Sequence, residues 1–102
     1  MKYKKIKQKI KGKIYILYVA DTPKKQIQGL SNMDISKKEG MIFIYPDEQP
    51  DRLFTMAKTK HKLRLIFIDE KENIVHQEIG YPYQKKSITC KKPSKYVIEI
   101  LS

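Results

Sequence analysis

Apolar and charged residues alternate along the first part of the chain, between residues 5 and 19. Side chains of a strand point in turn to its two faces, so this pattern predicts strands with one dry and one wet face. Gly12 is the turn-forming residue. A two-residue loop would place the isoleucines on both faces of the strands. A loop with an odd number of residues, or one long bent strand, would keep them on one face, and we expect the loop with an odd number of residues. The two alternating sets are Ile6, Ile10, Ile14, Ile16 and Tyr18, and Lys5, Lys7, Lys9, Lys11 and Lys13.

Further along the chain, the pattern predicts one short helix and several short strands. Thr22 can cap a helix that begins at Pro23, where the missing N–H costs nothing, and Gly29 marks its end. The apolar, aromatic segment 40–46 predicts a buried strand that Pro46 stops. Strand patterns follow at 52–56, 63–69, 74–80 and 95–101, and the turn at 69–73 joins two of them into a hairpin.

These elements predict a single domain. A chain of 102 residues, 40% of them hydrophobic and 32% charged, has the size and composition of one globular core. About seven short strands and one short helix predict a mainly β fold, which we expect to be a compact antiparallel β-sandwich or small barrel. Within it, residues 1–18 form a lysine-rich strand or hairpin, and residues 19–100 form the rest of the core.

Charge is the strongest bias in the composition. The formal net charge is +11, and the basic residues are twenty lysines with only Arg52 and Arg64. Because arginine reads phosphates and base edges better than lysine does, this excess favours a solubilising surface over specific nucleic-acid recognition. It also predicts a loose, salt-sensitive attraction to anions.

The cysteine content and the N-terminus bear on the compartment. Cys90 is the single cysteine, which excludes an internal disulfide, and its spacing from His61 and His76 is not that of a zinc site. The N-terminus has no apolar run typical of a signal peptide or membrane anchor. We therefore expect a cytoplasmic protein without a membrane partner, present as a monomer or weak dimer.

No combination of residues indicates catalysis. Glu78 follows His76 by two positions, so the two side chains share a strand face, which is typical of a surface contact. The other acidic residues fit a helix cap, loops and a turn, and the methionines fit core packing. We expect no catalytic residue, no metal and no cofactor, and a protein that binds its ligand without transforming it.

Four collinear blocks of the sequence resemble one family. The blocks are VADTPKKQIQGLS, EGMIFIYP, the segment from Phe54 through LRLIFID, and KPSKYVIEI. In order and spacing they are similar to the small bacterial and archaeal family catalogued as domain of unknown function 192, over residues 19–100. The resemblance implies a compact β-sandwich or barrel with one short helix, and it implies no established reaction.

The polar positions of that family's central motif are altered in this chain. The family motif runs Phe-Trp-Met-Lys-Asn-Thr and then Pro-Leu-Asp. Thr55 stands at the tryptophan position, and Arg64 stands at the acidic position. The chain thus resembles a divergent, shortened member that keeps the hydrophobic skeleton and reverses the charge of the polar set. The matching residues are Phe54, Met56, Thr59 and Leu63, and the other altered positions hold Ala57, Lys58 and Lys62.

The altered segment 58–64 carries a cation at every second position. An extended backbone would place all four cations on one face, where their mutual repulsion favours a bound anion. The alternative is a solvated loop or edge whose lysines discourage aggregation. The candidate ligand is a phosphorylated small molecule or a nucleotide, and the candidate site residues are Lys58, Thr59, Lys60, His61, Lys62 and Arg64.

The N-terminal lysines predict an alternative function. Five cations on one face could follow a phosphate backbone, as in a basic protein that associates nonspecifically with nucleic acid. Tyr15 is the nearest aromatic residue on their parity, so base stacking adds little support. We therefore expect a small binding module for an anionic molecule, with nucleic-acid association as the alternative through Lys5, Lys7, Lys9, Lys11 and Lys13.

Overall fold

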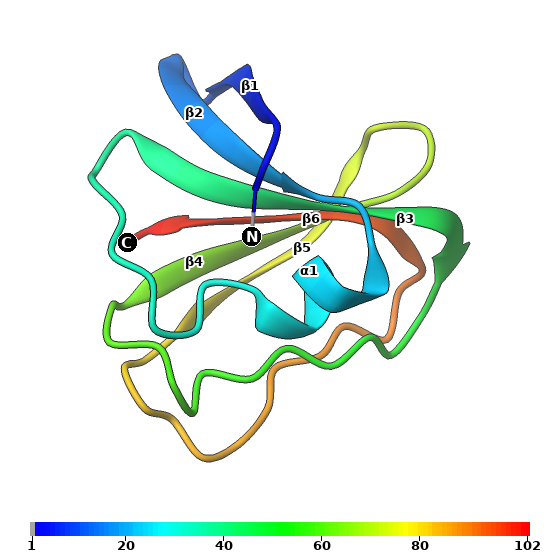
Figure 1. Cartoon of the computed structure of the whole chain (residues 1–102). Coiled ribbons are helices and arrows are strands. Elements are labelled where there is room, and N and C mark those ends of the chain that lie inside the picture. The colour runs from blue at the N-terminus through cyan, green and yellow to red at the C-terminus, as the bar shows by residue number, and fades with distance from the viewer. Residues whose placement is uncertain (1) are drawn as a thin grey trace.

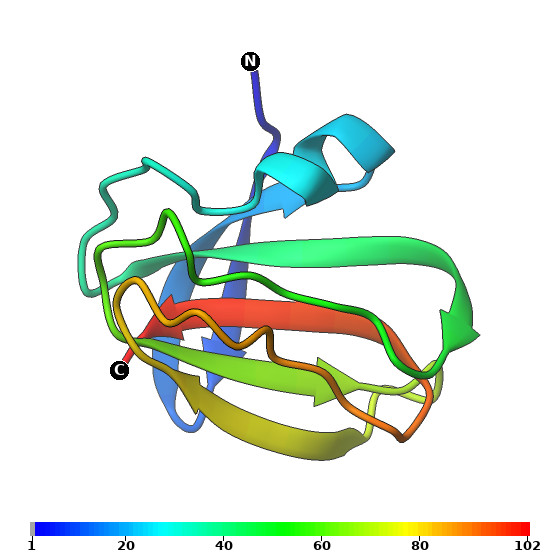
Figure 2. The same cartoon turned by 90° about the horizontal axis from the view of Figure 1, so that it is seen from below.

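The computed structural model describes residues 2–102 and contains one six-stranded mixed sheet and one short helix (Figures 1 and 2). The order of strands across the sheet is β1-β2-β3-β6-β4-β5. The mainly β class with one helix is therefore confirmed. The elements are β1 (Lys5–Ile10), β2 (Lys13–Ala20), α1 (Pro23–Gln28), β3 (Glu39–Gln49), β4 (Leu63–Ile68), β5 (Ile74–Gly80) and β6 (Ser94–Leu101).

Two details of the expected architecture are wrong. All six strands lie in one sheet with β1 and β5 at its edges, so within residues 2–102 the sheet is not closed into a barrel. The strands are also not all antiparallel, because β2 and β3 pair in parallel. The reason is the connection: α1 and the loop after it return the chain to the end of the sheet where β2 began, as a crossover does.

The loop between β1 and β2 has two residues, so the expected odd loop is wrong. Ile10 pairs with Lys13, and the loop residues Lys11 and Gly12 both have positive φ, 49° and 84°. Two such residues form the tight turn whose twist matches that of the flanking strands. The isoleucines are scattered as a result: Ile14 lies opposite Lys9 and is 61% exposed. The residues of β2 that reach the core are instead Leu17, Val19 and Ala20.

The other predicted elements, except the strand at 52–56, are confirmed with changed boundaries. The hydroxyl of Thr22 accepts a hydrogen bond from the backbone N–H of Lys25 and caps α1 as expected. Strand β3 runs on through Pro46 to Gln49, because the register shifts between Ile44 and Gln49 and no regular ladder bond is needed there. The strand expected at 52–56 is wrong, since the segment makes only an isolated bridge between Phe54 and Ile88.

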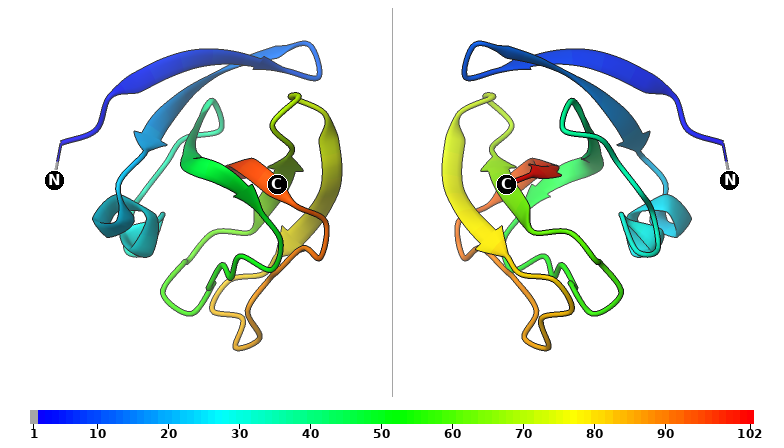
Figure 3. Two further views of the ribbon diagram at one scale, coloured as in Figure 1. Left: turned by 90° about the vertical axis from the view of Figure 1, so that its right-hand side faces the viewer. Right: turned by 90° about the vertical axis from the view of Figure 1, so that its left-hand side faces the viewer.

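The sheet buries apolar side chains on both faces. On one face, Phe43, Phe54 and Phe67 pack edge to face, with ring centroids 5.2 and 5.7 Å apart, beneath α1 and the long loops. On the other face, the β1–β2 hairpin arches over a second cluster that includes Ile66 and Ile98 (Figure 3). Because both faces are covered, β3, β4 and β6 are buried strands, and the surface available for a ligand lies beside the covering elements.

Candidate functional site

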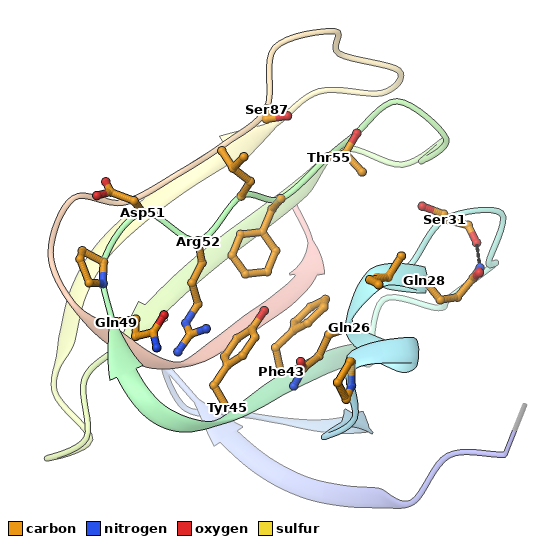
Figure 4. Close-up of a pocket in the computed structure, with 15 residues that line it drawn as sticks. Gln26, Gln28, Ser31, Phe43, Tyr45, Gln49, Asp51, Arg52, Thr55 and Ser87 are labelled. Carbon is orange, nitrogen blue, oxygen red and sulfur yellow. Dashed lines mark hydrogen bonds between the residues drawn. The ribbon is translucent and has the colours of Figure 1, made fainter.

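An open groove lies between α1 and the segment 49–55 (Figure 4). Its volume is about 640 Å³. Phe43 and Tyr45 of β3 form its floor, and α1 contributes Gln26 and Gln28 to one wall. A cavity of this size, with mixed apolar and polar walls, falls in the range of small-molecule sites.

Hydrogen bonds from Gln26 hold α1 against the sheet and shape one wall of the groove. The amide nitrogen Nε2 donates to the carbonyl oxygens of Ala20, at 3.2 Å, and of Ile44, at 2.9 Å. Gly29 ends the helix with φ of 51° and donates its N–H to the carbonyl of Lys25. The wall is therefore fixed by bonds to β2 and β3, which leaves the amide oxygen of Gln26 as an acceptor beside the groove.

Arg52 is the most constrained polar side chain of the groove. Its guanidinium carbon lies 3.7 Å from the ring centroid of Tyr45, and the side chain is only 14% exposed. Nε donates to the carbonyl oxygen of Ser94, and Nη2 donates to the carbonyl oxygen of Asp47 and lies 3.5 Å from its carboxylate. Within residues 2–102, Nη1 has no acceptor, so Arg52 presents two free N–H groups in a fixed orientation.

Tyr45 remains a neutral hydroxyl under Arg52. Burial raises the pKa of Tyr45 to about 12, and the negative charge of Glu99 adds to this effect while the positive charge of Arg52 opposes it. The hydroxyl therefore keeps its proton at neutral pH. Together, Tyr45 and Arg52 offer hydrogen-bond donors on the floor of the groove.

The mouth of the groove is apolar. Ile27 on α1 is 82% exposed and Leu53 is 73% exposed, and both line the groove from opposite sides. Thr55 also lines it, with its hydroxyl accepting a hydrogen bond from the N–H of Ala57 at 3.1 Å. Thr55 stands at the position where the resembled family motif has tryptophan, so a small side chain lines the groove there.

The predicted anion site is not one face of a strand. Segment 57–62 is a loop, which is the alternative that the sequence left open, and its cations do not form the row that an extended backbone would give. Lys60 and His61 both lie against Asp34, at 2.9 and 3.0 Å, and these contacts hold the pKa of the Asp34 carboxyl below its ordinary value. Thr59 is buried. Two of the six candidate side chains are thus already paired with a carboxylate.

The remaining residues of that candidate set point to different surroundings. Lys58 is exposed in the loop, and the ammonium group of Lys62 lies 5.6 Å from the ring centroid of Tyr81. Arg64 lies on β4 and donates to the side-chain oxygen of Gln77 at 3.3 Å. The structure therefore separates Arg64 from the loop cations with which the sequence grouped it.

The N-terminal lysines also divide between two faces. Lys5, Lys7 and Lys9 of β1 share a face, because each pairs with an even-numbered residue of β2. The two-residue turn places Lys11 at the tip of the hairpin and Lys13 on the opposite face, where it pairs with Ile10. The expected row of five lysines on one face is therefore wrong, since the loop is one residue shorter than that row requires.

A buried carboxyl group lies in the core beneath the loops. Glu99 of β6 is 5% exposed and pairs with Met41 of β3 and Leu65 of β4. None of the ion pairs among residues 2–102 includes it. Burial in this apolar setting raises the pKa of Glu99 to about 8. At neutral pH this side chain is largely protonated.

Two features are absent from the described residues. Residues 2–102 hold no cluster of three or more histidine, cysteine or acidic side chains suited to a metal ion. None of the helical segments in that range is both long enough and apolar enough to pass through a membrane.

Sequence reasoning missed the groove. Arg52, Tyr45 and Gln26 come from a loop, a strand and a helix, and no local pattern connects them. One signal was available: Arg52 is one of two arginines beside twenty lysines. A guanidinium that stacks on an aromatic ring and donates to fixed carbonyls cannot be replaced by an ammonium group.

These features define a small, mainly β domain with an open groove beside the helix α1. The chain belongs to the DUF192 family, described as uncharacterized ACR, whose model matches residues 5–102. The resemblance read from the sequence is thereby confirmed, and it extends through β1. Among curated proteins no match is found.

Two solved structures share the fold. A proposed transcription regulator from Sinorhizobium meliloti is 25% identical with a TM-score of 0.83, over 100% of this chain and 84% of that one. A protein of unknown function from Novosphingobium aromaticivorans is 22% identical with a TM-score of 0.80, over 96% of this chain and 72% of that one. The fold is thus common to proteins whose sequences have diverged widely.

Proposed function

We propose that this protein is a binding module whose ligand occupies the groove between α1 and segment 49–55. The observation that carries the proposal is Arg52, which is stacked on Tyr45 and held by backbone carbonyls while two of its N–H groups remain free. Because the guanidinium is already fixed, its side chain has lost its conformational entropy on folding. Binding of a ligand therefore does not incur this entropy cost.

The walls indicate the chemistry of the ligand. Ile27 and Leu53 at the mouth suit an apolar group, and Arg52 and Tyr45 on the floor suit an oxygen acceptor. Asp51 lines the groove and the carboxylate of Asp47 neutralises Arg52, so the groove has little net positive charge. We therefore propose an uncharged small organic molecule with a carbonyl or hydroxyl oxygen, rather than the anionic ligand that the overall charge suggested.

Binding without catalysis is part of the proposal. The ionisable side chains that line the groove are Tyr45, Asp51 and Arg52. The raised pKa of Tyr45 makes its hydroxyl a poor proton donor and a poor base near neutral pH. A binding role without proton transfer accords with this set of residues.

Filling the groove is expected to abolish binding. In Thr55→Trp an indole ring would occupy space at the groove wall, and small-molecule fragments that bind the groove should bind at least about tenfold more weakly. Chemical shifts of the side-chain amides of Gln26, Gln28 and Gln49 during a fragment titration would measure this effect.

Thr55→Val is the matched control, because it removes the hydrogen bond to the N–H of Ala57 without filling the groove. Fragments should shift the groove amides equally in this variant and in the unaltered protein. Equal binding by Thr55→Trp, or fragments that bind only elsewhere, would contradict the proposed site. Separately, mass spectrometry of small molecules that co-purify with the unaltered protein would identify the natural ligand.

Nonspecific binding to nucleic acid is the second candidate function. Lys5, Lys7 and Lys9 share an exposed face of the edge strand β1, and the Sinorhizobium meliloti relative is described as a proposed transcription regulator. If these three lysines neutralise three phosphates, the logarithm of the binding constant for duplex DNA should fall with the logarithm of the salt concentration, with a slope of about −3.

A filter-binding titration at several salt concentrations measures this slope. Replacing the three lysines together with glutamine should bring it close to zero, whereas replacing Lys24, Lys37 and Lys85 makes the same change of charge elsewhere and should leave it nearly unaltered. A slope that does not depend on the β1 lysines would remove this candidate.

A further inference from the structure

A second cavity lies where the β1–β2 hairpin approaches β4. Its volume is about 250 Å³, and Leu101 and Ser102 are among the residues that line it. Ile66 and Ile100, both buried, and the half-buried Tyr15 give it an apolar floor and an aromatic wall. Three cationic side chains line the same cavity: Lys11, Lys13 and Arg64.

Two of these cations meet at one uncharged oxygen. Nζ of Lys11 and Nη1 of Arg64 each lie 3.3 Å from Oε1 of Gln77. Like charges brought this close repel each other, and an amide oxygen offsets the repulsion only in part. The contact also joins the tip of the hairpin to strand β5 at the far edge of the sheet, so the arrangement depends on the fold and not on one segment.

The lining of this cavity offers no side-chain carboxylate to balance its three positive charges. The lining contains no aspartate or glutamate. The ion pairs found within residues 2–102 involve none of Lys11, Lys13 and Arg64. An anion that entered the cavity would therefore be attracted by three cations without displacing an aspartate or glutamate side chain.

We propose that this cavity binds a small organic phosphate monoester. The phosphate would lie among Lys11, Lys13 and Arg64, where the guanidinium can donate two parallel hydrogen bonds. The aromatic or other flat apolar group of the ester would lie on the floor beside Tyr15. The volume is below the range of roughly 300–1,000 Å³ for drug-sized ligands, which suits a group about as large as one ring.

This site is independent of the groove beside α1, and it joins residues from both cationic surfaces that the sequence suggested. Arg64 came from the segment 58–64, and Lys11 and Lys13 came from the N-terminal row. The tertiary structure brings them together because the hairpin arches back over the sheet (Figure 3). The floor distinguishes the proposed ligand from a bare phosphate, which would gain nothing from Ile66 and Ile100.

Gln77→Glu tests the proposal without removing any cation. The new carboxylate has the shape of the amide and would pair with Lys11 and Arg64 inside the protein. Affinity for phenyl phosphate should therefore fall at least tenfold. Titrations of ¹⁵N-labelled protein with phenyl phosphate, followed at the amide signals of Lys13 and Tyr15, measure the affinity and locate the site.

Gln84→Glu is the control, since it makes the same change of charge in the loop between β5 and β6 and should leave the affinity unaltered. Lys13→Gln, a change at an exposed side chain, should weaken binding several-fold. Inorganic phosphate and phenol should each bind more weakly than phenyl phosphate. Equal affinity in Gln77→Glu and Gln84→Glu, or inorganic phosphate binding as tightly as phenyl phosphate, would overturn the proposal.

Discussion

Replacing Glu99 with glutamine is expected to stabilise the protein increasingly as the pH rises. The free energy of unfolding of Glu99→Gln, relative to that of the unaltered protein, should increase by about 3 kcal/mol between pH 5 and pH 8. The reason is the buried position of Glu99 on β6, which raises the pKa of its carboxyl to about 8 from an ordinary value of 4.5.

The sign of this effect follows from the direction of the pKa shift. Below pH 4.5 the carboxyl is protonated in the folded and unfolded states alike, so its ionisation costs nothing. As the pH rises from 4.5 toward 8, the unfolded chain releases the proton while the folded protein retains it, and unfolding becomes more favourable. Glutamine has no proton to release and keeps a neutral side chain throughout.

Guanidinium unfolding of both proteins at pH 5, 6, 7 and 8 measures the difference. Comparing the two proteins at each pH cancels the titration of all other groups. A difference in stability that stays constant across this range would show that the Glu99 carboxyl titrates normally in the folded state, and it would contradict the prediction.

Replacing Gly40 with alanine is expected to cost about 3 kcal/mol of folding free energy or to prevent folding. A methyl group at this position of β3 would lie 2.4 Å from the carbonyl oxygen of Glu99. It would also lie 2.8 Å from Cγ2 of Ile100 and 3.0 Å from Cδ2 of Leu17. Because the nearest atom belongs to the backbone of a paired strand, β3 and β6 would have to separate to relieve the overlap.

Gly80→Ala is the matched comparison for this prediction. Its methyl group would lie 2.7 Å from Sδ of Met56 and 2.9 Å from Cδ1 of Ile88, both of which are far ends of flexible side chains. These side chains can shift, so the expected loss is smaller, about 1 kcal/mol. Thermal unfolding of both variants would test the order, and an equal or larger loss for Gly80→Ala would contradict it.

The local pattern was sufficient for most secondary structure. Short strand patterns predicted β4, β5 and β6, and the Thr22 cap, Pro23 and Gly29 predicted α1, since these signals act over a few residues. The hairpin loop was mispredicted because alternation alone does not distinguish one register from the next. The twist-matched turn at Lys11 and Gly12 decided the register, and it moved Ile14 to the exposed face.

The candidate sites depended on contacts that no local pattern contains. For segment 58–62 the sequence left open an extended row of cations or a solvated loop. The structure has the loop, in which Asp34, far away in the sequence, pairs with Lys60 and His61. Arg52 and Tyr45 form the floor of the groove only because the chain turns back after β3. Arg64 meets Lys11 only because the hairpin arches over the sheet.

By itself, the sequence determined the mainly β class, the single helix, the family and the strongly basic charge of this protein. Each of these follows from composition, from spacing along the chain or from collinear blocks of residues. The tertiary structure alone decided the parallel pairing of β2 with β3, the groove, the burial of Glu99 and the meeting of three cations at the hairpin. These features arise from the packing of distant segments, because a side chain's exposure and charge partners are set by neighbours that the chain brings together only on folding.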